Sequence, residues 1–159
     1  MNYSTLKFSS KALFILLISA ASIVYSSCSK SSTTTTSSTP VTKATIFTAS
    51  VNGSPVISFV GSKSTASGTT SLIGVSSSYT ITLSFPSTTG TGNFFFSSTG
   101  FNASIVNGSN TYVSNATYGS GTLTIDSITG GKYYGYFSFI GQTTSLASMN
   151  VSGGRFSNL

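Results

Sequence analysis

Apolar and polar side chains alternate along most of the chain from Lys43 onward. The clearest case is residues 79–85, where every second residue is apolar: Tyr79, Ile81, Leu83 and Phe85. Such alternation indicates strands with one buried face. Residues 45–51 follow the same pattern, and the Asn52-Gly53 pair after them is favoured in tight hairpin turns. The pattern predicts a hairpin here, with the next strand running from Pro55 toward Val60.

Further strands are predicted at 93–97, 101–106, 110–118, 121–126, 132–140 and 149–156, and glycine-rich segments separate most of them. β-branched and aromatic residues dominate, and no segment after Cys28 has the 3.6-residue period of a helix. The sequence therefore predicts an all-β domain, a single antiparallel β-sandwich or partly closed barrel of about nine to ten short strands. Residues 43–159 are enough for one such core and too few for two.

The chain before Lys43 has a different pattern. Two lysines precede an apolar run over residues 12–24, and Cys28, the only cysteine, follows shortly after it. This layout is typical of a secretory signal, because the apolar run is shorter than the roughly 20 residues that span a bilayer. Residues 25–28, Tyr-Ser-Ser-Cys, resemble a bacterial lipobox, which implies diacylation of Cys28 and cleavage before it. The alternative is cleavage near residues 19–21 and release of a secreted protein.

Three parts of the chain follow from this pattern. We expect residues 1–27 to be a lipoprotein signal peptide, residues 28–42 to be the acylated cysteine with a Ser/Thr-rich linker, and residues 43–159 to be the β domain. The linker has almost nothing to bury, so its expected role is to hold the domain away from the lipid surface. Acyl chains on Cys28 would anchor the protein to a membrane, since each buried methylene contributes about 0.8 kcal/mol.

Charge and composition exclude several function classes. Asp126 is the only acidic residue, and there is no histidine. General acid–base catalysis and zinc or calcium sites draw on His, Cys, Asp and Glu, so we predict that the protein is not an enzyme and holds no metal or other cofactor. The net charge is +6, but the lysines and the arginine are scattered singly. Because nucleic-acid binding needs clustered cations along successive phosphates, no nucleic-acid partner is expected.

The strand predicted at 132–140 is aromatic on both faces. Alternation places Tyr134 and Tyr136 together on one face, beside Lys132. An exposed tyrosine pair offers a stacking platform for a sugar ring, and neighbouring Ser, Thr and Asn side chains could bind its hydroxyls. The alternative is that the two rings only stabilise the sheet through cross-strand contacts. In either case, alternation places Tyr133, Phe137 and Phe139 on the opposite face of the strand, which we expect to lie in the core.

Phe94, Phe95 and Phe96 are consecutive, so at least one ring must lie on the face opposite its neighbours. We expect a strand covered on both sides. An exposed ring would instead create an apolar patch suited to a protein partner or a lipid contact.

Four segments carry a family resemblance: FTASVNG at 47–53, SGTLTI at 120–125, GYFSF at 135–139 and GRFSN at 154–158. Together with the N-terminal signal they resemble a family of small, uncharacterised lipoproteins of Bacteroidota that carry one β-rich domain. The resemblance implies an outer-membrane location. Because residues 29–32 lack the acidic stretch associated with surface display, it favours the periplasmic face over the cell surface.

The same resemblance bears on residues 126–128. Asp-Ser-Ile is similar to the O-glycosylation acceptor of those bacteria, which implies that Ser127 lies in an exposed loop. The alternative is a plain turn.

The predicted function is that of a non-enzymatic, membrane-anchored envelope lipoprotein acting as a structural or interaction module. Its partner would be an envelope glycan or a protein. The alternative is a carbohydrate-binding module that uses Tyr134 and Tyr136, with Lys132 beside them.

Overall fold

The structure is a computed structural model and describes residues 44–159. The predicted signal peptide at 1–27, Cys28 and nearly all of the linker lie outside the described residues. The described residues form eleven strands and no helix, and therefore contain no helix able to span a membrane. The strands are β1 (Ile46–Val51), β2 (Ile57–Ser58), β3 (Val60–Ala66), β4 (Thr69–Val75), β5 (Thr80–Pro86), β6 (Gly92–Phe95), β7 (Asn102–Asn107), β8 (Asn110–Ser114), β9 (Ser120–Thr129), β10 (Lys132–Gln142) and β11 (Ser148–Ser157).

All strand pairs are antiparallel, and they follow the order β2-β1-β11-β10-β8-β7-β5-β4-β3. Strands β8 and β9 pair with the same edge of β10, the edge opposite β11. Strand β6 pairs with β9. The prediction of an all-β antiparallel fold is confirmed. The alternating pattern produced it locally: in β5, Ile81, Leu83 and Phe85 are buried while the residues between them are only partly covered.

The two ends of this strand order belong to one segment of chain, residues 57–66. Ile57 and Ser58 pair with β1, and the backbone N–H of Phe59 donates to the Phe47 carbonyl at 2.8 Å. From Val60 onward the segment pairs with β4 instead. The change of partner at Phe59 joins the ends of the sheet, so of the two predicted architectures the chain adopts the partly closed, barrel-like one.

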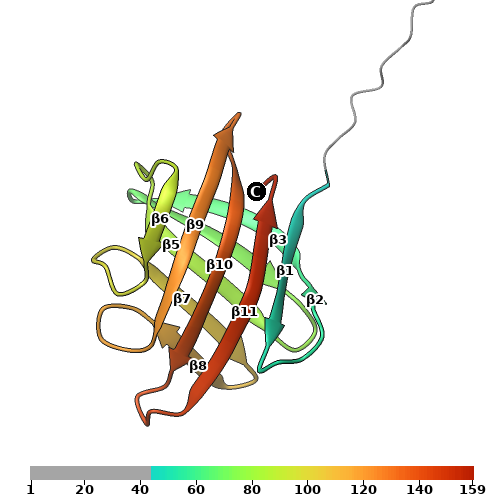
Figure 1. The fold of residues 1–159 in the computed structure, drawn as a ribbon, viewed down its shortest axis with the longest axis vertical. Helices are drawn as coiled ribbons and strands as arrows, with labels where there is room; N and C mark the ends of the chain where they lie inside the picture. The colour runs from blue at the N-terminus through green and yellow to red at the C-terminus, as the bar shows by residue number, and fades with distance from the viewer. Residues whose placement is uncertain (1–43) are drawn as a thin grey trace, which may run out of the picture. The chain divides into compact units, whose positions relative to one another are not determined.

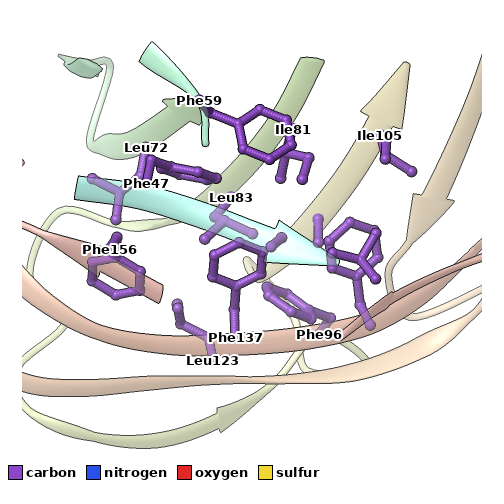
Figure 2. Close-up of a cluster of buried hydrophobic side chains, with 14 of the residues drawn as sticks. Phe47, Phe59, Leu72, Ile81, Leu83, Phe96, Ile105, Leu123, Phe137 and Phe156 are labelled. Atoms are coloured by element: carbon purple, nitrogen blue, oxygen red, sulfur yellow. The ribbon is translucent and has the colours of Figure 1, made fainter. Parts of the chain in front are cut away.

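Figure 1 shows two layers, with β6, β9, β10, β11 and β1 lying in front of β5 and β7. The core lies between them and is rich in aromatic side chains, several of which are visible in Figure 2. Phe137 is central: its ring centroid lies 5.2 Å from that of Phe47 and 6.4 Å from those of Phe139 and Phe156. Because large side chains fill the interior, a binding site is to be sought on the outer surface.

Inward-facing glycines make room for these rings. A Cβ built on Gly74 would lie 2.6 Å from Cε1 of Phe47, and one built on Gly154 would lie 2.6 Å from Cδ2 of Phe137. Real Cβ atoms are not found at such distances from ring carbons. Glycine at these two inward positions therefore leaves room for a large ring, a combination that is common inside small β-barrels.

The turn prediction at Asn52-Gly53 is confirmed, because both residues have positive φ, 50° and 74°. The strand predicted from Pro55 toward Val60 is shorter than expected, since only Ile57 and Ser58 form β2. The hairpin of β3 and β4 was not predicted. Ser67 and Gly68 form its turn, and β3 lacks the buried alternate positions that identify a strand in sequence.

Two other expectations are wrong. Phe95 is 60% exposed while Phe96 is fully buried, so the strand at 94–96 is not covered on both sides. Phe94 points to the inner side and stacks on Phe101 with ring centroids 4.9 Å apart. Residues 126–128 form neither an exposed loop nor a turn, because they lie within β9, where Ser127 pairs with Tyr134.

Candidate functional site

The outer face of β9, β10, β11 and β1 carries a row of side chains centred on Tyr136. The register places Tyr136 opposite Thr124 on β9 and opposite Arg155 on β11. Arg155 in turn lies opposite Thr48 on β1. All four lie at outward positions because their neighbours in each strand point into the core. The sheet thus joins residues from four strands into one surface.

A bulge in β11 hollows this surface. Thr48 pairs with Arg155 and Ser50 with Ser152, so Gly153 and Gly154 together face the single residue Ala49. Gly153 has φ of 58°, which glycine adopts without the steric cost that a side chain would bring. A Cβ at Gly153 would meet no atom within 4 Å. The surface beside Gly153 is therefore open.

An outer-face depression of about 560 Å³ results. This volume is within the range of small-molecule sites. Its lining combines an exposed aromatic ring, an apolar side chain, hydroxyl groups and one cation: Thr48, Val56, Thr122, Thr124, Tyr136, Phe137, Ser138, Gly153, Gly154 and Arg155.

Tyr136 and Arg155 form one wall of the depression. Tyr136 is 49% exposed, and the guanidinium carbon of Arg155 lies 5.9 Å from the centre of its ring. A guanidinium at this distance from an aromatic ring is attracted by the ring's negative face. Arg155 is exposed, so the N–H groups of its guanidinium reach the surface beside this ring.

A smaller hollow of about 100 Å³ lies on the same face, lined in part by Asp126, Tyr134, Tyr136, Arg155 and Ser157. Asp126 is there because β9 has an extra residue: Gly135 pairs with Ile125 and Tyr134 with Ser127, which leaves Asp126 without a partner in β10. The Ser157 hydroxyl is buried with no hydrogen-bond partner in residues 44–159. Tyr136 and Arg155 line both hollows.

No protein-family model, curated protein or solved structure matches this chain.

The structure brings together some of the residues predicted from sequence. Tyr134 is half-buried and lines the smaller hollow with Tyr136, so the two rings share a face as predicted. Lys132 lines neither hollow; its amine donates to Oδ1 of Asn158 at 2.8 Å. It precedes Tyr136 by four residues, about 13 Å along a strand. Ser127 is half-buried opposite Tyr134.

Sequence reasoning missed Arg155, the glycines at the bulge and the hydroxyl groups of Thr122, Thr124 and Ser138. One signal was present for Arg155. It is the only arginine in the chain, and it comes directly before the apolar Phe156 in the strand predicted at 149–156, so alternation places it on the outer face. Its position beside Tyr136 depends on the pairing of β10 with β11, which alternation does not specify.

The described part of the chain has no group of three or more His, Cys, Asp or Glu side chains placed to hold a metal ion. The polar groups around the depression are hydroxyls and the guanidinium of Arg155. Such groups donate and accept hydrogen bonds, so this arrangement suits the reversible binding of a polar molecule.

Proposed function

We propose that this chain is a non-enzymatic, membrane-anchored lipoprotein of the cell envelope whose β domain acts as a structural or interaction module. The depression beside Tyr136 and Arg155 carries the interaction part of this proposal. It combines an exposed ring, hydroxyl groups and a cation on the outer face of a sheet whose interior is filled. Sites that bind small molecules combine apolar surface with a few polar groups in the same way.

The anchor part of the proposal rests on the N-terminal sequence, with its lysines, short apolar run and Cys28. The resemblance to Bacteroidota lipoproteins extends it to a location at the outer membrane, facing the periplasm or the cell surface. Release as a secreted protein is the alternative.

Carbohydrate binding is a second candidate function, and the exposure of Tyr136 favours it. One face of a sugar ring is apolar and stacks on an aromatic ring, while its hydroxyls need donors and acceptors nearby. Thr122, Thr124 and Ser138 supply hydroxyls in the same depression. The Thr122 and Ser138 hydroxyls lie 3.4 Å apart. Thr124 donates to Oδ1 of Asn93, so the hydroxyl of Thr124 is left to accept from a ligand. Val56, which is 65% exposed, adds apolar surface to its lining.

The test is a binding screen of the purified protein against glycans and envelope polysaccharides. Tyr136→Ala should weaken binding, since it removes the stacking surface, whereas Tyr136→Phe should keep most of the affinity. Stacking on an aromatic side chain is worth about 1 kcal/mol, so the alanine variant should bind roughly 5-fold or more weakly. Unchanged binding by Tyr136→Ala would exclude this site.

If no glycan binds, crosslinking in the intact envelope would identify protein partners of the module. Val56 and Thr122 are suitable positions for a crosslinking residue, because both are exposed and line the depression, and replacing them leaves Tyr136 and Arg155 in place. A crosslink at these positions, absent when the crosslinker is placed at exposed Ser62 on β3, would support an interaction module whose partner is a protein.

A further inference from the structure

Arg155 has hydrogen-bonding capacity that the described chain does not use. A guanidinium carries five N–H donors in a rigid fork. Within residues 44–159 the Arg155 side chain has neither an ion pair nor a hydrogen bond, and its contact is with the Tyr136 ring. The other two cations of this part of the chain are engaged: Lys63 donates to the Gly131 carbonyl and Lys132 to Asn158.

The charges around Arg155 favour an anion in the larger depression. Asp126, the only acidic side chain, lines the smaller hollow and not the larger one. Residues 44–159 carry Lys63, Lys132 and Arg155 against Asp126, a side-chain charge of 3 − 1 = +2. Arg155 shares the smaller hollow with Asp126 but forms no ion pair with it among the described residues. An acidic group in the larger depression would therefore meet a guanidinium whose N–H groups this carboxylate does not hold.

The bulge leaves space for such a group beside the guanidinium. Gly153 has no side chain, and a Cβ in its place would have no neighbour within 4 Å. The guanidinium carbon lies 5.9 Å from the centre of the Tyr136 ring, and a planar guanidinium can bind an oxyanion there in a bidentate manner.

We propose that the ligand of the outer-face depression is an acidic saccharide, whose carboxylate or sulfate group binds Arg155 while its sugar ring stacks on Tyr136. This inference rests on the carbohydrate-binding function proposed above. It predicts a preference for charged over neutral polymers of the same backbone.

Two matched pairs of polymers test the preference with the purified protein: polygalacturonate against its methyl ester, and dextran sulfate against dextran. The first pair isolates a carboxylate and the second a sulfate. At least one charged polymer should bind about 10-fold more tightly than its neutral partner, because hydrogen bonds to charged groups contribute more binding free energy than hydrogen bonds between neutral groups. The preference should weaken as salt is added.

Variants separate the site from general charge attraction. Arg155→Gln should abolish the preference, whereas Lys63→Gln, which removes the same charge from β3, should retain it. Gly153→Asn should weaken binding of the preferred polymer at least 5-fold, because asparagine tolerates positive φ and its side chain would occupy the depression. Thermal melts of each variant exclude unfolding as the cause.

The outcomes distinguish the inference from the function on which it rests. Equal binding of charged and neutral polymers that is lost in Tyr136→Ala would overturn the acidic ligand and leave carbohydrate binding in place. A charge preference lost equally in Arg155→Gln and Lys63→Gln would overturn the assignment to Arg155. No binding by any of the four polymers would overturn the acidic-saccharide inference, whereas carbohydrate binding itself would be overturned only by a negative result in the wider glycan screen.

Discussion

Replacing Gly74 by alanine tests whether the small inward positions of the sheet are required by the aromatic core. The added Cβ would lie 2.6 Å from Cε1 and 2.9 Å from Cγ of Phe47. The Phe47 ring has little room to move, since its centroid is 5.7 Å from that of Phe59 and 5.2 Å from that of Phe137. Overpacking of this kind costs about 1–3 kcal/mol of unfolding free energy.

A double-mutant cycle makes this prediction specific. Phe47→Ala alone should cost about 3–5 kcal/mol, because it leaves a cavity in the core. With the ring removed, the methyl group of Gly74→Ala no longer collides with it, so the double variant should cost no more than Phe47→Ala. The two changes should therefore be coupled by about 1 kcal/mol or more, where independent sites would add.

Urea unfolding of the purified variants measures these differences through the midpoint and the slope. Gly90→Ala is the matched control, because a Cβ there meets nothing within 4 Å, and its effect should stay within about 0.5 kcal/mol. The packing argument would be refuted if Gly74→Ala behaved like Gly90→Ala, or if the costs of Gly74→Ala and Phe47→Ala simply added.

Three further predictions concern the anchor, the phenylalanine triplet and the end of the chain. Cys28→Ala should remove palmitate labelling and shift the protein out of the membrane fraction of an expressing bacterium; an unlabelled parent protein would instead support secretion. Phe95→Thr should change the free energy of unfolding by less than about 0.5 kcal/mol because the ring is exposed, whereas Phe96→Ala should lower it by about 3–5 kcal/mol because that ring is buried. Equal effects of the two variants in urea unfolding would contradict this difference. Leu159→Ala should lower the free energy of unfolding by about 2 kcal/mol or more, since the leucine side chain is 5% exposed and packs on Gly61. The Leu159 carbonyl, which accepts from the Tyr133 N–H at 2.7 Å, holds this residue in place. A thermal melt within about a degree of the parent would show that this packing contributes little.

Part of the candidate site was predictable because it depends on alternation within one strand. The pattern at 132–140 placed Tyr134 and Tyr136 opposite the core residues Tyr133, Phe137 and Phe139, and the structure agrees. The association with Lys132 was not found, since Lys132 lies four positions before Tyr136 and its amine donates to Asn158. Residues that share a face can lie too far apart to share a site.

Local sequence determined most of the strands and which of their side chains point inward, because backbone pleating has a period of two and acts on neighbours along the chain. Strand β3 is the exception, since almost all of its side chains are exposed and its sequence lacks buried alternate positions. It also determined the turn at Asn52-Gly53, where the residue types themselves favour positive φ. The tertiary structure decided which strands become neighbours and in what register. Arg155 meets Tyr136 through the pairing of β10 with β11, the depression opens at the Gly153 bulge, and the sheet closes where Phe59 separates β2 from β3. Each of these depends on contacts between residues distant in sequence, which alternation along one strand does not encode.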